Sequence, residues 1–204
     1  IHMAFSPFPH ISLFPVPHLG HTWFIDGSSS RPSHQSPVKA GYAIVSSTSI
    51  IESMALPAST TSQQAELIAL TWAVILAKGL RVNIYTDSKY AFHILHHHAV
   101  IWAERGFLTT QGSSFINATL IKTLLKAALF PKEAGVIHCK GHQKASDLIA
   151  QVKAYADKVA KKAAIKRHQI PSFQDNAYAD KVAKKAAIKR HQIPWLRTML
   201  MLIR

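Results

Sequence analysis

The sequence is poor in several features that define large classes of proteins. It contains one cysteine, Cys139, so no intramolecular disulfide can form, which favours a reducing compartment. No apolar run reaches the roughly 18 residues of a membrane-spanning helix, and we expect no membrane partner. The first twenty residues lack Lys and Arg, and prolines interrupt their apolar stretch, so they do not read as a signal peptide. We therefore expect an intracellular protein, in the cytoplasm or the nucleus.

Acidic residues are also scarce, and the resulting basic excess is unevenly spread. Residues 1–150 carry 11 Lys and Arg against seven Asp and Glu, whereas residues 151–204 carry 13 against three. A nearly balanced segment followed by a strongly basic one favours a polyanionic partner, most often nucleic acid. A solvated basic helix without a partner would have the same composition.

The 204 residues are enough for one domain and about fifty residues of additional chain. We expect a Pro-rich linker at residues 1–20, a folded domain at residues 21–167, and a basic helix with an apolar tail at residues 168–204. The last segment contains a repeat, because the 18 residues from Ala154 to Pro171 recur unchanged from Ala177 to Pro194. Two copies are too few for a solenoid, so we interpret them as a tandem duplication of one helix.

Periodicity predicts an α/β domain. Apolar or alternating runs predict five strands, at residues 22–26, 39–46, 49–56, 81–86 and 135–139. Helical patterns begin near residues 61, 88, 113 and 154. This order indicates a mixed five-stranded sheet flanked by helices, with an extra basic C-terminal helix.

Three carboxylates occupy suggestive places in this order. Asp26 ends the first predicted strand, Glu66 lies early in the first helix, and Asp87 directly follows the fourth strand. If the two strands are neighbours and the helix crosses them, the three side chains converge. Such a cluster needs cations, and Mg²⁺ prefers oxygen ligands of this kind. Two such ions could activate a water and stabilise the leaving oxygen of a phosphodiester.

Several segments resemble one family, in order and in spacing. They are F-I-D-G-S-S, K-A-G-Y-A-I-V, L-P-A-S-T-T-S-Q-Q-A-E-L-I-A-L, V-N-I-Y-T-D-S-K-Y-A-F, E-R-G-F-L-T-T-Q-G and I-H-C-K-G-H-Q-K. Together they resemble the ribonuclease H domain of a gammaretrovirus-type reverse transcriptase, over residues 21–167. The resemblance implies the ribonuclease H fold and hydrolysis of the RNA strand of RNA/DNA hybrids with two Mg²⁺ or Mn²⁺ ions. It also implies an endogenous-retrovirus origin and the polymerase part of a reverse transcriptase as a partner.

The resemblance assigns roles to individual residues. Asp26, Glu66 and Asp87 match three of the family's four metal-binding carboxylates. His142 matches a loop histidine that assists proton transfer or product release, a role that suits an imidazole near neutral pH. Ser88 and Tyr90 match positions near the nucleic-acid groove, and we expect Arg105 and Lys153 to contact nucleic acid as well.

The fourth carboxylate departs from the family pattern, which is G-N-x-x-A-D on the last helix. Its spacing from the G-H-Q-K segment selects Asp157, but Val152-Lys153 replaces the Gly-Asn pair and puts Lys153 near the metals. The second copy of the repeat retains the Asn and offers Asp180, at a much longer spacing. We predict Asp157, with Asp180 as the alternative.

Two other functions fit the same residues less well. A degenerate retroviral domain would keep the fold and bind nucleic acid through its basic tail without cutting it, and the changes around Lys153 favour this alternative. An integrase-type strand-transfer enzyme would share the fold, but the first-helix Glu and the G-H-Q-K segment suit the nuclease better. The adjacent His96, His97 and His98 are not expected to form a metal site, because successive helical side chains point in different directions.

Overall fold

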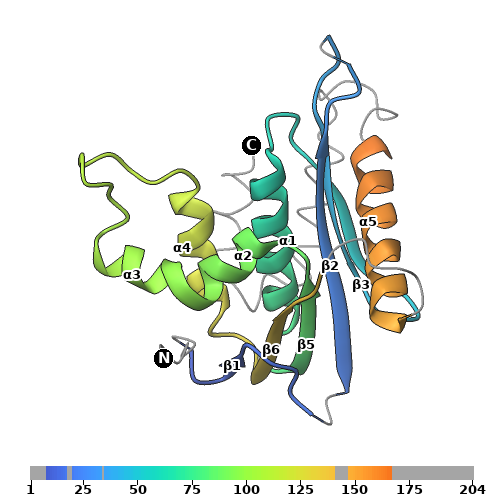
Figure 1. The fold of residues 1–204 in the computed structure, drawn as a ribbon, viewed down its shortest axis with the longest axis horizontal. Helices are drawn as coiled ribbons and strands as arrows, with labels where there is room; N and C mark the ends of the chain where they lie inside the picture. Colours follow the sequence, from blue (N-terminus) through green and yellow to red (C-terminus); the bar gives the residue numbers. More distant parts are fainter. Residues whose placement is uncertain (1–7, 18–19, 34, 141–146, 167–204) are drawn as a thin grey trace, which may run out of the picture.

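A mixed sheet forms the centre of the computed structural model, which describes residues 8–17, 20–33, 35–140 and 147–166 (Figure 1). Within these residues the strand order is β1–β6–β5–β2–β3–β4. The strands are β1 (Ile11–Ser12), β2 (His21–Ser30), β3 (Lys39–Val45), β4 (Ile50–Leu56), β5 (Arg81–Thr86) and β6 (Glu133–His138). Strands β2, β3 and β4 pair antiparallel, and β2, β5, β6 and β1 pair parallel. The predicted α/β class with a mixed sheet is confirmed.

The prediction of five strands was wrong by one. The additional strand, β1, lies in the segment that we predicted as a linker, where Ile11 pairs with Ala134 of β6. Ile11 is buried, and the His10 ring hydrogen bonds to the Ala128 carbonyl at 2.7 Å. A two-residue strand is too short to show alternation, so only its partner in the folded sheet reveals it.

Helices cover both faces of the sheet (Figure 1). They are α1 (Ser62–Leu76), α2 (Lys89–His93), the π-helical turn η1 (Ile94–His98), α3 (Ala99–Glu104), α4 (Ala118–Ala127) and α5 (Leu148–Lys166). Helix α5 lies alone on one face among the described residues, and α1 packs on the other. None of the described helices is long and apolar enough to cross a membrane. The predicted extra C-terminal helix falls outside the described residues.

Local chemistry explains where two of these helices begin. Thr61 caps α1, because its hydroxyl accepts a hydrogen bond from the Gln64 backbone and the Gln64 side chain accepts one from the Thr61 backbone. Helix α4 starts later than the predicted residue 113. Asn117 precedes it with φ of +67°, a left-handed conformation that Asn tolerates better than most residues.

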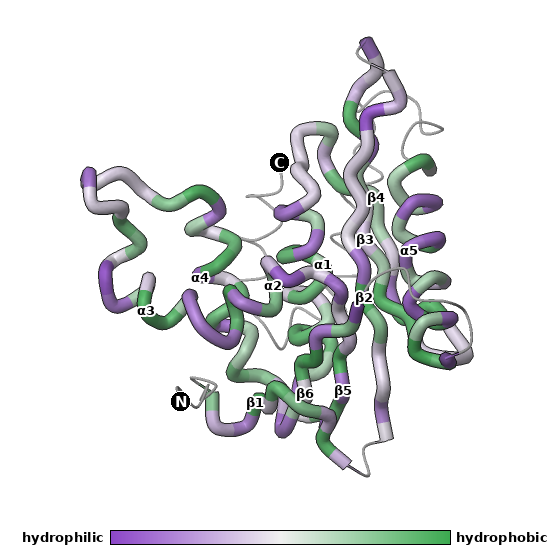
Figure 2. Tube along the Cα trace, in the orientation of Figure 1, coloured by the Kyte–Doolittle hydropathy of each residue, from purple (hydrophilic) through white to green (hydrophobic). Residues whose placement is uncertain are grey.

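The sheet separates two apolar cores. The larger one lies between the sheet and α1 and α4. The smaller one lies under α5 and consists of Phe24, Ala43, Val45, Val152, Ala156, Val159 and Ala160. Figure 2 shows apolar stretches in the central strands and alternating apolar and polar residues along α5. At Gly41 of β3, an added Cβ would lie 2.6 Å from the Ala164 backbone nitrogen, so α5 packs directly on the strand.

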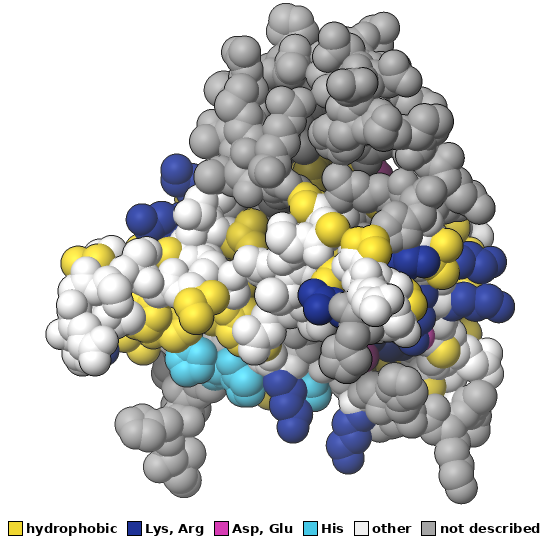
Figure 3. Space-filling view, turned by 90° about the horizontal axis from the view of Figure 1, so that it is seen from above, with side chains coloured by type: hydrophobic (Ala, Val, Ile, Leu, Met, Phe, Trp, Pro, Cys, Tyr) yellow, Lys and Arg dark blue, Asp and Glu magenta, His cyan; other side chains and the backbone are white. Residues whose placement is uncertain are grey.

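The histidine-rich segment, residues 93–98, contains one buried imidazole, that of His96, and several accessible ones. His96 is 1% exposed, and its Nε2 lies 3.0 Å from the Val136 carbonyl, while its Nδ1 has no hydrogen-bond partner among the described residues. Burial lowers the pKa of His96 to about 4, so the ring is neutral at pH 7. Histidine side chains form a patch beside apolar ones on the face in Figure 3.

We expect the buried imidazole to make stability depend on pH. The unfolded chain binds a proton near pH 6.5 whereas folded His96 binds one near pH 4, so its contribution is present above pH 6.5 and is lost as pH falls toward 4. The loss between pH 7 and pH 4.5 should be about 2–3 kcal/mol. Urea unfolding of the unaltered protein and of His96→Phe measures it as a difference. The exposed control, His93→Phe, should follow the unaltered protein, and parallel curves for all three would contradict the prediction.

Candidate active site

Strand register brings two of the three predicted carboxylates together. Strands β2 and β5 run parallel with Phe24 opposite Tyr85, and the two rings stack with centroids 5.1 Å apart. Continuing this register by two residues places Asp26 beside Asp87, so the expected pairing of these strands is confirmed. The prediction that Asp26 ends its strand was wrong. It lies inside β2, because residues 27–30 continue to pair with β3 beyond the end of β5.

Gly27 brings the third carboxylate to the same place. A Cβ at this residue would lie 2.4 Å from the Ala65 carbonyl carbon and 2.4 Å from the Glu66 nitrogen. The first part of α1 therefore touches the backbone of β2 immediately after Asp26. Such an approach is possible only where no side chain intervenes. Glu66 is thereby positioned over Asp26.

The three carboxylates form a cluster that suits a hard cation. Asp26, Glu66 and Asp87 each offer an oxygen atom, and these atoms lie within 4.8 Å of one another. The Oε2 atom of Glu66 is buried and has no hydrogen-bond partner among the described residues. Oxygen donors of this type are the ligands that Mg²⁺ and related ions prefer. The residues present therefore fit a divalent metal site.

A lysine from α5 reaches into this cluster. The ammonium of Lys153 forms an ion pair with Asp26 and lies 2.8 Å from Oδ1 of Asp87. It also donates a hydrogen bond of 2.8 Å to the Ile25 carbonyl, and the residue is only 5% exposed. We expected Lys153 to lie near the metal ligands and to contact nucleic acid. The first expectation is confirmed, because α5 packs its apolar side on the sheet and carries the lysine stem inward with it. The nucleic-acid contact stays a prediction.

Burial and mutual repulsion shift the pKa values in the cluster. Burial raises the pKa of Asp26 to about 6, although Lys153 opposes the shift. Burial, followed by the charge of Asp26, raises the pKa of Glu66 to about 8. Burial alone would lower the pKa of Lys153, but Asp26 and Asp87 outweigh it and raise the value, so the ammonium stays charged. The single positive charge of Lys153 is thus too little to neutralise three ionised carboxylates.

The two candidates for the fourth carboxylate differ in what the structure describes. Asp157, on α5, is outside the group of three, and its Oδ2 accepts a hydrogen bond of 2.7 Å from Lys161 one turn later. Its charge nevertheless contributes to the raised pKa of Asp26. Asp180 lies outside the described residues. Asp157 therefore remains our predicted fourth ligand.

The other predicted residues lie at separate places. Ser88 caps α2, its hydroxyl accepting a hydrogen bond of 3.2 Å from the Ala91 backbone. The Tyr90 hydroxyl accepts one of 3.1 Å from the Asn117 amide. Arg105 is exposed at the end of α3. His142 lies outside the described residues.

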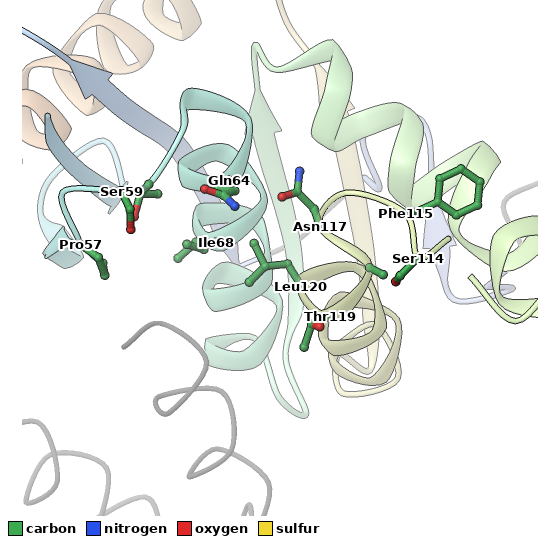
Figure 4. A pocket seen from close by; sticks show the side chains of 11 residues that line it. Pro57, Ser59, Gln64, Ile68, Ser114, Phe115, Asn117, Thr119 and Leu120 are labelled. Carbon is green, nitrogen blue, oxygen red and sulfur yellow. The ribbon is translucent and has the colours of Figure 1, made fainter. Parts of the chain in front are cut away.

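A hollow between the beginnings of α1 and α4 was not predicted from the sequence. It has a volume of about 320 Å³, and its mixed lining includes the polar residues Gln64 and Asn117 and the apolar residues Ile68 and Leu120 (Figure 4). The Oδ1 atom of Asn117 is buried and has no hydrogen-bond partner among the described residues. The signal available beforehand was Asn117 inside the pattern predicted to be helical from residue 113, because Asn is a residue type that tolerates positive φ.

Comparison with known proteins accounts for this arrangement. A family model described as RNase H matches residues 19–188. The chain belongs to the RNase H family. The match includes both Asp157 and Asp180, so it is compatible with either as fourth ligand.

Similar RNase H sequences occur in retroviral polyproteins. The chain is 46% identical over 158 residues to the Pol polyprotein of Radiation murine leukemia virus (strain Kaplan), covering 78% of this chain and 27% of that protein. It is 46% identical over 150 residues to the Gag-Pol polyprotein of Baboon endogenous virus (strain M7), covering 74% and 9%. The Pol polyprotein of Feline endogenous virus ECE1 is 45% identical over 150 residues, covering 74% and 14%. The chain thus spans about a quarter or less of these relatives.

Solved structures share the RNase H fold at lower identity. The solution structure of the prototype foamy virus RNase H domain aligns with a TM-score of 0.58 and 23% identity, covering 71% of this chain and 93% of that one. A foamy viral protease-reverse transcriptase in complex with an RNA/DNA hybrid aligns with a TM-score of 0.60 and 20% identity, covering 75% and 21%. The predicted ribonuclease H-like fold and the gammaretroviral resemblance are confirmed.

Proposed function

We propose that the chain hydrolyses the RNA strand of RNA/DNA hybrids with two bound divalent ions. The observation that carries the proposal is the convergence of Asp26, Glu66 and Asp87 in a domain of the RNase H family. The complex of a foamy viral relative with an RNA/DNA hybrid supports the same substrate. The strongly basic segment at residues 151–204 supports a polyanionic partner.

The three carboxylates would hold the metal ions, which we propose to be Mg²⁺, with Mn²⁺ as a substitute. When bound, such ions activate a water molecule and stabilise the leaving oxygen of the phosphodiester. The protein supplies rigidity: Asp26 is fixed inside β2, and Glu66 is held over it by the contact at Gly27. Carboxylates fixed by a sheet and a helix need little rearrangement to take up cations.

The remaining predicted residues would act on the nucleic acid. His142 is proposed to assist proton transfer or product release. Ser88, Tyr90 and Arg105 are proposed to contact the hybrid, which the protein would recognise through its backbone shape and 2′-hydroxyls more than through its bases. The relatives are polyproteins, so we propose that the polymerase part of a reverse transcriptase is a partner.

Metal removal provides the direct test of this function. The purified chain should cut the RNA strand of a labelled hybrid in Mg²⁺ or Mn²⁺, and it should leave double-stranded DNA and double-stranded RNA of the same sequence intact. Excess EDTA should abolish cleavage, and added Mg²⁺ should restore it. Cleavage that persists in EDTA would contradict the metal site.

A second function is favoured by Lys153, whose ammonium already neutralises part of the cluster. In this alternative the domain binds hybrids without cutting them. Filter binding and cleavage measured on the same samples separate the two functions. Hybrid binding with no product at any Mg²⁺ or Mn²⁺ concentration would favour the binding-only domain.

A further inference from the structure

We propose that Lys153 is a built-in substitute for a divalent cation, and that its ammonium must leave the carboxylate cluster before a metal ion can bind between Asp26 and Asp87. The proposal rests on the proposed function, because it concerns the same site. It adds a regulatory property, since the lysine lowers the affinity of the domain for its own metal ions.

The contacts of the ammonium are complete. A lysine ammonium has three N–H donors and no acceptor. Lys153 has three oxygen partners: Asp26, Asp87 at 2.8 Å and the Ile25 carbonyl at 2.8 Å. No donor is left for solvent or for a phosphate group. The ammonium thus occupies the position between the carboxylates that a bound cation would take.

The position of the ammonium conflicts with that of a metal ion. A cation that bridges Asp26 and Asp87 would use the same pair of carboxylates that Lys153 contacts. A charged ammonium and a divalent ion a few ångströms apart repel each other strongly in a site shielded from water. The cluster therefore holds either the ammonium or the metal between these two residues.

The lysine is held there by the packing of α5. Val152, next to it, is buried in the smaller core, and Ala156 and Ala160 on the same side of the helix are fully buried. Lys153 precedes these two alanines by three and seven residues, so it belongs to the face that the helix turns toward the sheet. The packing of this face therefore holds the ammonium of Lys153 against the oxygens of Asp26, Asp87 and the Ile25 carbonyl.

The fourth predicted ligand has a similar counterion. The Oδ2 atom of Asp157 accepts a hydrogen bond from Lys161, at 2.7 Å on the next turn of α5. The pair is partly exposed, with side-chain exposures of 33% and 57%, so it contributes little to stability. Asp157 can exchange this partner easily, whereas Asp26 and Asp87 must release a buried one.

Isothermal titration with Mg²⁺ tests the proposal without relying on activity. Lys153→Asn removes the ammonium, and we expect it to bind Mg²⁺ about tenfold more tightly or better than the unaltered protein. Lys153→Arg keeps the positive charge and should bind Mg²⁺ as weakly as the unaltered protein. Lys162→Met is the matched control, because it removes an exposed charge from the same helix. Equal affinity of Lys153→Asn and Lys162→Met would overturn the proposal.

Thermal unfolding over a series of Mg²⁺ concentrations covers the case in which Lys153→Asn is unstable without metal. The melting temperature of this variant should then rise steeply with Mg²⁺, whereas that of the unaltered protein should rise little. Equal responses would overturn the proposal.

The two proposals fail separately. If the unaltered protein cleaves hybrids and binds Mg²⁺ as tightly as Lys153→Asn, the lysine proposal is wrong and the nuclease stands. If Lys153→Asn binds Mg²⁺ more tightly but no variant cleaves hybrids, the lysine proposal is supported and the nuclease is not.

Discussion

Replacing Asp87 with Asn is expected to reduce hybrid cleavage by more than about 100-fold, since even partners of metal ligands contribute about 10–100-fold. The change keeps the shape of the side chain and removes the negative charge that a metal ion requires. Asp87 is the best choice in the cluster, because its side chain is 24% exposed while that of Asp26 is 7% exposed. The fold should therefore tolerate the change. Initial cleavage rates at saturating Mg²⁺ and equal protein concentration measure it.

Two further carboxylate variants serve as a control and as a test of the fourth ligand. Glu104→Gln removes an exposed charge at the end of α3 and should cleave at the unaltered rate. Asp157→Asn should lose activity if Asp157 is the fourth ligand and retain it if that ligand lies elsewhere in the chain. Full activity of Asp87→Asn, with an unchanged circular dichroism spectrum, would remove the metal-site assignment.

Replacing Gly27 with Val is expected to lower the free energy of unfolding by more than about 3 kcal/mol, the upper part of the range for overpacked sites. Even a single Cβ would lie 2.4 Å from the backbone of Ala65 and Glu66, and neither backbone can turn aside as a flexible side chain would. Helix α1 would have to move away from β2, which opens the larger core. Urea unfolding measures the loss.

The same change should also weaken metal binding, because it separates Glu66 from Asp26. Gly20→Ala is the control, since a Cβ at Gly20 has no atom within 4 Å and its φ is not positive. We expect this control to match the unaltered protein within about 0.5 kcal/mol. A Gly27→Val protein as stable as Gly20→Ala would show that the contact between α1 and β2 is not needed.

The carboxylates could be predicted from sequence because each lies beside a strong local signal. An apolar strand precedes Asp26 and another precedes Asp87, and the capping box at Thr61 fixes the start of the helix that carries Glu66. These signals are local, so they survive without knowledge of the fold. Only the pairing of the strands had to be assumed, and the resemblance to the ribonuclease H family supplied it.

The features that sequence reasoning missed depend on partners distant in the chain. Strand β1 forms because its two residues pair with the edge of β6, and the sequence of two residues does not predict that pairing. Lys153 was expected near the metals only from its place in the family pattern, and its burial and its ion pairs with Asp26 and Asp87 depend on how α5 packs. Its environment is set by the rotation of α5 on the sheet, which the sequence does not state. The charge balance at the site was therefore less predictable than the site itself.

The tight seat of α5 on Gly41 also determines how fast cations could exchange. With Ala160 and Ala164 against the strand backbone, the helix cannot roll without breaking its contact. The lysine must therefore depart by rotation about its own side-chain bonds, and rotamer changes of that kind take far less time than rearrangements of helices. Exchange of cations at the site would then depend on breaking the buried contacts of the ammonium, and it would need no movement of the helix.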